Sequence, residues 1–279
     1  MSDNRYARLT WKRMMDSIVT CDQQPDQIIY AIRLTLLAKS KKTYHLPPFV
    51  SLEYSHGLYQ LKIKKPAICL RDIMEDGEFL QEHGHMVIKG LLETLKELRE
   101  ANATIHNLSP DNVYINSSGT RLVVTDLFAI SFKGMRILDM GRESMPYGNQ
   151  DLTEHELTGF HDQERSLWSV GMIILELFVG TDLVHSMKSN SEVVELLDYV
   201  SAQLGARIYQ LLKALLFEVR FSIVQDTLDD GILANPDRVS KAFKDVERRR
   251  TVSKYLQDIL KEGGNEVKSY SEEPISVFG

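Results

Sequence analysis

Hydrophobic residues recur at helical spacing in several parts of the chain. Residues 25–39 and 79–102 carry apolar side chains at every third or fourth position, which predicts amphipathic helices. Residues 164–179 are apolar on nearly all sides, which predicts a buried helix, and Gly180 is suited to end it. The same spacing predicts further helices at 190–203, 205–218 and 237–262.

Short runs of β-branched and aromatic residues predict two hairpins. Residues 49–54 and 58–63 flank a turn at 55–57, and residues 112–126 fold back on themselves around a turn at 117–119. Both turns contain serine and glycine, and the arms of the second hairpin are β-branched. We therefore expect strands both before the helix at 79–102 and after it.

Three other stretches carry weaker patterns. Residues 6–11 are compatible with a strand. Residues 131–162 show no regular period, and irregular stretches of this length are usually functional or disordered. Residues 263–279 are polar, and we expect them to form a flexible tail.

Composition and charge narrow the class of protein. The chain is 43% hydrophobic and 26% charged, as is usual for a globular protein. Its net charge is -6, so it lacks the excess of basic residues that is typical of proteins that bind nucleic acid. Cys21 and Cys69 are too far apart to suggest a disulfide framework or a zinc site. Residues 1–13 lack the apolar core of a secretion signal, and the apolar run at 170–179 is too short to span a bilayer. We therefore expect a cytoplasmic protein, cytosolic or associated with the cytoskeleton or cilium, that is not secreted and does not span a membrane.

Three motifs follow one another on these predicted elements. Residues 105–112 read I-H-N-L-S-P-D-N between the helix at 79–102 and the second hairpin, residues 126–128 read D-L-F, and residues 167–171 read L-W-S-V-G. This order resembles the large lobe of eukaryotic protein kinases, whose pattern is H-R-D-L-K-P-x-N, D-F-G and D-x-W-S-x-G. The resemblance covers roughly residues 24–236 and is specific because all three motifs occur at near-family spacing.

The resemblance implies that the catalytic loop is degenerate. Asn107 stands where the family has the aspartate that accepts the substrate's hydroxyl proton, and a neutral amide cannot act as that base. Ser109 replaces the lysine that helps to hold the transferring phosphate, and Ile105 and His106 replace the histidine and arginine before the aspartate. No catalytic residue is therefore expected among these positions.

Two positions match the family's magnesium ligands. These are Asn112 and Asp126, but two oxygen ligands without nucleotide phosphates make a poor magnesium site, so structural roles are favoured for both. The first glycine of the chain is Gly57, so no glycine-rich loop can be placed over a nucleotide. We expect no cofactor, with Mg²⁺ and ATP binding vestigial at most.

Architectural positions of the family match better. Asp151 ends a segment similar to the family's A-P-E, and Arg220 resembles the late arginine that pairs with that acid. The resemblance implies that the two form a buried ion pair, which persists because the loss of one partner would strand a charge. Ser166 replaces the aspartate that begins the buried helix, so we expect a cap without charge and the loss of that aspartate's brace on the catalytic loop.

Together these features predict an α+β fold of the protein kinase type, with a mostly helical large lobe and a truncated small lobe. The predicted parts are a reduced small lobe at 1–66, a kinase-like large lobe at 67–236, a helical extension at 237–262 and the tail at 263–279. The implied function is that of a catalytically inactive scaffold or structural subunit that binds other proteins.

Alternative interpretations remain open from the sequence. One is an atypical ATP-dependent protein kinase whose base is supplied elsewhere, for example by Asp111. Another is a helical adaptor whose motif matches are coincidental. The apolar stripe at 237–262 either docks into a partner protein or packs on the chain's own core.

Overall fold

The computed structural model describes the chain in separate stretches. The predicted strand at 6–11 and the predicted tail at 263–279 lie outside them. Of the predicted helix at 25–39, Ile32 and Arg33 are described, and both are helical. The described residues are 17–21, 32–33, 44–46, 49–55, 58–63, 66, 68–106, 108–116, 120–125, 130–132, 146–148, 163–218, 220–230, 233, 239 and 243.

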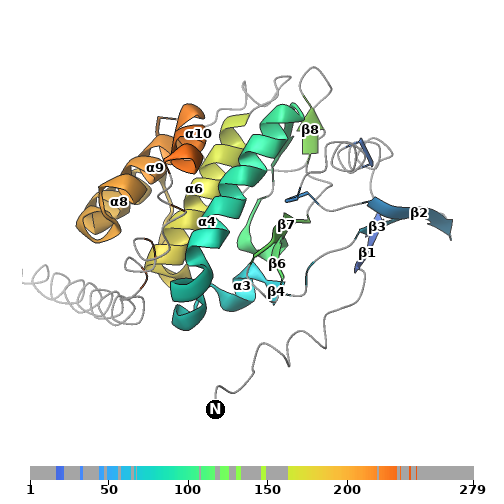
Figure 1. The fold of residues 1–279 in the computed structure, drawn as a ribbon, viewed down its shortest axis with the longest axis horizontal. Helices are drawn as coiled ribbons and strands as arrows, with labels where there is room; N and C mark the ends of the chain where they lie inside the picture. Colours follow the sequence, from blue (N-terminus) through green and yellow to red (C-terminus); the bar gives the residue numbers. More distant parts are fainter. Residues whose placement is uncertain are drawn as a thin grey trace, which may run out of the picture.

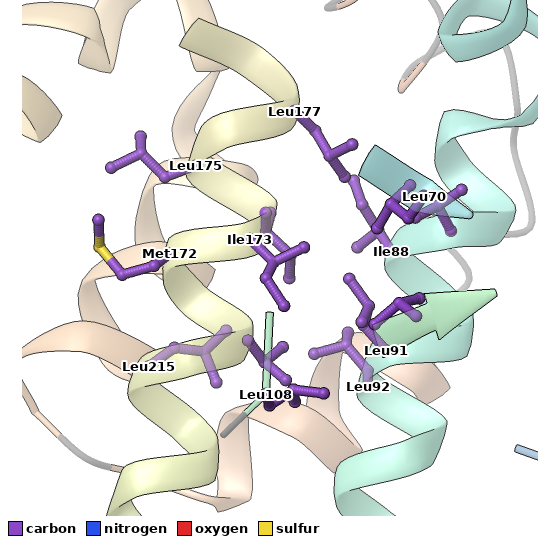
Figure 2. Close-up of a cluster of buried hydrophobic side chains, with 14 of the residues drawn as sticks. Leu70, Ile88, Leu91, Leu92, Leu108, Met172, Ile173, Leu175, Leu177 and Leu215 are labelled. Atoms are coloured by element: carbon purple, nitrogen blue, oxygen red, sulfur yellow. The ribbon is translucent and has the colours of Figure 1, made fainter. Parts of the chain in front are cut away.

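Two long helices, α4 (Gly77–Glu100) and α6 (Gln163–Val179), lie side by side at the centre of the helical part (Figure 1). Side chains of α6 are buried from Ser166 to Val179, as expected for a helix that is apolar on all sides. Ile173 of α6 points toward Leu91 and Leu92 of α4, and these residues form the centre of the core (Figure 2). Both helices were predicted from their periodicity, and both predictions are confirmed.

Of the helices that follow α6, two pack directly against it and two pack on other helices. Gly180 ends α6 at a φ of 93°, and Gly205 separates α8 from α9 at a φ of 76°, a backbone region that favours glycine at both positions. The helix α9 packs on α6, α8 packs on α9, and α10 contacts both α9 and α4 (Figure 1). The periodicity predicted α8 and α9 but not the short helices α7 and α10. The bounds are α7 (Thr181–Ser186), α8 (Asn190–Leu204), α9 (Ala206–Leu216) and α10 (Ser222–Asp229).

Three antiparallel strands form a sheet that lies to one side of the helices (Figure 1). Strands β2 (Phe49–Ser55) and β3 (Leu58–Ile63) form the predicted hairpin, with Tyr54 opposite Tyr59. Strand β1 (Ser17–Cys21), which the sequence pattern did not reveal, pairs with the other edge of β3. The strand order is therefore β1-β3-β2.

Two smaller sheets lie closer to α4. The predicted hairpin at 112–126 is confirmed, because β6 pairs with β7 and β4 extends the sheet at the other edge of β6. In the second sheet β8 pairs with β5, so residues 130–132 form a strand just where the irregular stretch was expected to begin. The short helix α3 follows β4 directly. The bounds are β4 (Ile68–Cys69), α3 (Leu70–Ile73), β5 (Ala103–Ile105), β6 (Val113–Ile115), β7 (Leu122–Val124) and β8 (Ile130–Phe132).

Two residues of the predicted extension at 237–262 are described, and both are buried. Val239 and Phe243 are helical and lie in the same core as the rest. The ring of Phe243 stacks on Phe178 of α6 at 4.5 Å between centroids. A Cβ on Gly84 of α4 would lie 2.4 Å from the Phe243 ring, so only glycine allows this close approach. These two positions of the apolar stripe therefore pack on the chain's own core.

The described elements establish a mixed α+β fold. None of the helices that the structure describes is both long and apolar enough to cross a bilayer.

Candidate functional site

The segment that matches the catalytic loop begins at the end of β5. The side chain of Ile105 is fully buried, and its backbone N–H donates to Ser166 Oγ at 3.3 Å. The same hydroxyl donates to the carbonyl oxygen of Ile105 at 3.1 Å. Ser166 lies inside α6, which begins at Gln163, so its predicted role as a helix cap is wrong. The expected loss of the brace is also wrong, because the neutral hydroxyl satisfies both backbone groups of Ile105.

Replacing Ser166 with alanine tests this brace. The change leaves the buried N–H and C=O of Ile105 without the hydroxyl and should lower the free energy of unfolding by about 1–3 kcal/mol. Ser186→Ala is the matched control, because that hydroxyl also donates to a carbonyl oxygen, of Leu183, but on the surface. The control should stay within about 0.5 kcal/mol of the natural protein in urea denaturation. Equal effects of the two changes would show that the brace contributes nothing.

His106, which matches the family's arginine, is turned into the protein. Its side chain is buried, and its Nε2 lies 2.7 Å from Oγ of Ser131 on β8. The imidazole therefore joins β5 to β8 rather than facing an open cleft. The next residue, Asn107, lies outside the described residues, so its role stays a prediction.

Ser109 and Asn112 close a single 3-10 turn, η1 (Pro110–Asn112), in a reciprocal capping arrangement. The Oδ1 of Asn112 accepts from the backbone N–H of Ser109 at 3.0 Å. The carbonyl oxygen of Asn112 accepts from the N–H of Thr125 at 2.8 Å, which ties the turn to the end of β7. The side-chain oxygen that matches a metal ligand of the family thus helps to hold the loop.

The second predicted metal position, Asp126, lies outside the described residues. Within the part of the chain that the structure describes, no three His, Cys, Asp or Glu side chains gather as a metal-ligand set. The interpretation of Asn112 and Asp126 as a vestigial metal pair stays a prediction.

A cluster of polar side chains that the sequence analysis did not anticipate surrounds Arg71 of α3. Its guanidinium donates to Glu176 of α6 and to the hydroxyl of Tyr147. Its Nη2 and Nε also lie 3.3 Å and 3.4 Å from Oδ2 of Asp111 in η1. Tyr147 in turn donates to Oε2 of Glu176 at 2.6 Å, and His185 Nε2 lies 3.2 Å from the same hydroxyl. We call these five residues the Arg71 cluster.

Burial makes the charges of the Arg71 cluster depend on one another. The side chain of Glu176 is 0% exposed, and a buried carboxylate requires a countercharge and hydrogen bonds. Burial alone would lower the pKa of Arg71, but the hydrogen bond to Tyr147 and the charge of Glu176 raise it overall. Burial raises the pKa of Tyr147, and the charge of Glu176 adds to the effect. Arg71 therefore stays charged, and Tyr147 keeps the proton that it donates to Glu176.

The Arg71 cluster joins segments that are distant in the sequence. It links α3, η1, residues 146–148 and α6 through one guanidinium. Asp111, the alternative candidate for a base, is 64% exposed at its side chain but is engaged by Arg71. A sequence signal did exist, since Glu176 is the one charged residue in the run from Leu167 to Val179. Its partners could not be named without the fold.

Arg220, predicted to form a buried pair with Asp151, is exposed. Its side chain is 57% accessible, and its Nη2 lies 3.0 Å from Oε2 of Glu218. The burial implied for Arg220 is therefore wrong, because the residue follows the end of α9 at the surface, where it pairs with a neighbouring acid. Asp151 lies outside the described residues, so its own partner stays a prediction.

No family model and no curated protein matches this chain. Any statement of its function therefore depends on the residues and contacts described above.

Proposed function

We propose that this chain is a catalytically inactive, kinase-like domain that acts in the cytoplasm as a scaffold or structural subunit by binding other proteins. The observation that carries the proposal is the use of Asn112. Its Oδ1 accepts from the Ser109 N–H at 3.0 Å and so closes a turn, which gives this side chain a structural role that needs no metal. Ser109 itself brings no positive charge for a phosphate.

The order of the elements supports the kinase-like part of the proposal. A long helix α4 is followed by β5, the turn η1 and the hairpin of β6 and β7, and then by β8 and the buried helix α6. An adaptor with coincidental motif matches gives no reason for a loop followed by a hairpin between residues 105 and 126. The described part of that segment has both.

Structural contacts that play no part in catalysis support the proposed role as a scaffold. A neutral serine joins α6 to β5, and the Arg71 cluster joins α3 and η1 to α6. These bonds fix the same segments that a kinase holds around its substrate, while the polar atoms they use are no longer offered to a ligand. A framework held together in this way suits a protein that works through its surface.

Thermal unfolding with Mg²⁺ and ATP tests the loss of nucleotide binding. A ligand at a hundred times its Kd stabilises the folded state by about 2.7 kcal/mol, and each kcal/mol raises the Tm by about 2–4 °C. We expect no saturable rise of the Tm at millimolar ATP. A saturable, Mg²⁺-dependent rise that disappears in Asp126→Ala but persists in Asp182→Ala, an exposed control in α7, would contradict the proposal.

Transfer of labelled phosphate from ATP to a general protein substrate separates this proposal from the atypical kinase. The proposal expects incorporation no higher than that of a boiled sample. Incorporation lost in Asp111→Ala would instead favour an enzyme with a displaced base, because Asp111 is the exposed carboxylate nearest to the position of the family's base in sequence.

A further inference from the structure

Residues Tyr44 to Leu46, which we call the 44–46 segment, are tied to α4 and to β7. The backbone N–H groups of Tyr44 and His45 donate to the carboxylate of Glu97 on α4 at 2.9 Å and 3.2 Å. On the other side, the N–H of Val124 donates to the carbonyl oxygen of His45 at 3.0 Å. Because β2 begins three residues after Leu46, this segment is one connection between the three-stranded sheet and the helical part.

The ring of His45 lies between two groups that accept hydrogen bonds. Its Nδ1 is 3.0 Å from the carbonyl oxygen of Leu122, and its Nε2 is 2.8 Å from Oε2 of Glu93. A carbonyl oxygen cannot donate, and neither can an ionised carboxylate. Both ring nitrogens can donate at once only when the imidazole carries a proton on each, which is the cationic form.

The surroundings favour an ionised Glu93. The hydrogen bond from His45 lowers the pKa of Glu93, and although burial opposes this, the charges of His45, Lys89 and Lys96 lower it further. Lys89 Nζ lies 3.8 Å from the second oxygen of Glu93. The carboxylate of Glu93 therefore stays ionised and accepts the hydrogen bond from His45.

The other titratable groups around His45 come from α4 and from the start of β7. On α4, Glu97 lies one turn beyond Glu93, and burial raises the pKa of Glu97 although the N–H groups of Tyr44 and His45 oppose the shift. On the other side, Arg121 Nε donates to the carbonyl oxygen of Tyr44 at 3.1 Å. The side chain of His45 is only 10% exposed, so water replaces a lost bond poorly.

We propose that His45 makes the attachment of the 44–46 segment to α4 and β7 sensitive to pH. The protonated ring stabilises this attachment, and loss of the proton weakens it. Loss of the proton turns a lone pair toward an oxygen, either that of Leu122 or that of Glu93. It also removes the positive charge beside the carboxylates of Glu93 and Glu97. The effect acts where the sheet joins the helical part and is independent of whether the chain binds nucleotide or protein partners.

The direction of the pH dependence follows from where the proton is bound. Only a ring with a proton on each nitrogen can donate to both acceptors, so the attachment is stronger on the acidic side of neutral pH than on the basic side. Glu93 sets the lower end of the pH range in which the attachment is present. Its pKa is lowered in the folded state, so its contribution is present above the ordinary carboxyl range and is lost as the pH falls through that lowered pKa.

Hydrogen exchange of single amides in the full chain tests this proposal. The amides of Tyr44, His45 and Val124 depend on the attachment, whereas those of α6 report the stability of the core. After correction for intrinsic rates, we expect exchange at the first set to rise several-fold from pH 6 to pH 8 relative to α6. Equal protection at both pH values in the natural protein would overturn the proposal, whether or not any variant folds.

Two histidine variants assign the effect. His45→Gln should abolish the difference between pH 6 and pH 8, because a neutral amide does not titrate. His83→Gln is the matched control, since His83 also lies near a glutamate, with Nε2 3.6 Å from Glu82, and should leave the difference intact. A difference that persists in His45→Gln, or that disappears in His83→Gln, would overturn the assignment to His45.

Discussion

Replacing Arg71 with alanine should lower the free energy of unfolding by about 3–5 kcal/mol, because it strands a carboxylate that is 0% exposed. Among the residues that the structure describes, Glu176 then keeps only the hydroxyl of Tyr147 as a close donor, with His185 at 3.9 Å. Urea denaturation followed by circular dichroism measures the change, with the midpoint expected to fall at an unchanged slope.

Arg220→Ala is the matched control for this prediction. It removes the same side chain from an exposed site where the partner, Glu218, is itself 39% exposed, so the change should stay within about 0.5 kcal/mol. Replacing both members, as in Arg71→Met with Glu176→Leu, should recover most of the loss, since the double change leaves no buried charge. If Arg71→Ala is no more harmful than Arg220→Ala, the Arg71 cluster does not hold these segments together.

Replacing Phe243 with alanine should cost about 3–5 kcal/mol, the range for deleting a fully buried aromatic side chain. The ring lies against Phe178 and covers Gly84, so its removal opens a cavity between α4, α6 and the segment that follows α10. The change is measured by the same denaturation experiment. Tyr199→Ala on α8 is the control, because that ring is 58% exposed and should contribute within about 0.5 kcal/mol.

This result has a practical consequence for finding partners. If Phe243→Ala is as mild as Tyr199→Ala, the segment at 237–262 does not depend on the core and the whole stripe is available for docking. If Phe243→Ala lowers the free energy of unfolding by the expected amount, a C-terminal truncation that removes Phe243 would destabilise the core as well as remove a docking helix. Affinity capture should then compare the full chain with a chain that ends just after Phe243.

Long helices were predictable from the sequence, because the burial of their side chains produces a hydrophobic pattern that repeats along the helix. The helix expected at 79–102 is found at Gly77–Glu100, and the one expected at 164–179 begins one residue earlier. Short elements were not predicted, because such a pattern needs several residues to repeat. The helix Thr181–Ser186 and the strand Ile130–Phe132 are too short to repeat a pattern, and their positions are fixed by partners elsewhere in the fold.

The candidate site was less predictable because its contacts join distant residues. Asn112 and Ser109 were identified by their match to the motif of the family, and their mutual hydrogen bonds are local. Arg71 lies 105 residues from Glu176, and nothing in the sequence near either residue names the other. Ser166 was assigned a role by analogy with an aspartate, and a hydroxyl proves sufficient because Ile105 presents both a donor and an acceptor.

We propose that the chain keeps the framework of a kinase but lacks the groups that bind and transfer a phosphoryl group. The most direct measurement is a crystal structure of the full chain grown with Mg²⁺ and a non-hydrolysable ATP analogue. We predict that Oδ1 of Asn112 still accepts from the Ser109 N–H and that no nucleotide is bound. A bound nucleotide whose magnesium is held by Asn112 and Asp126 would contradict the claim.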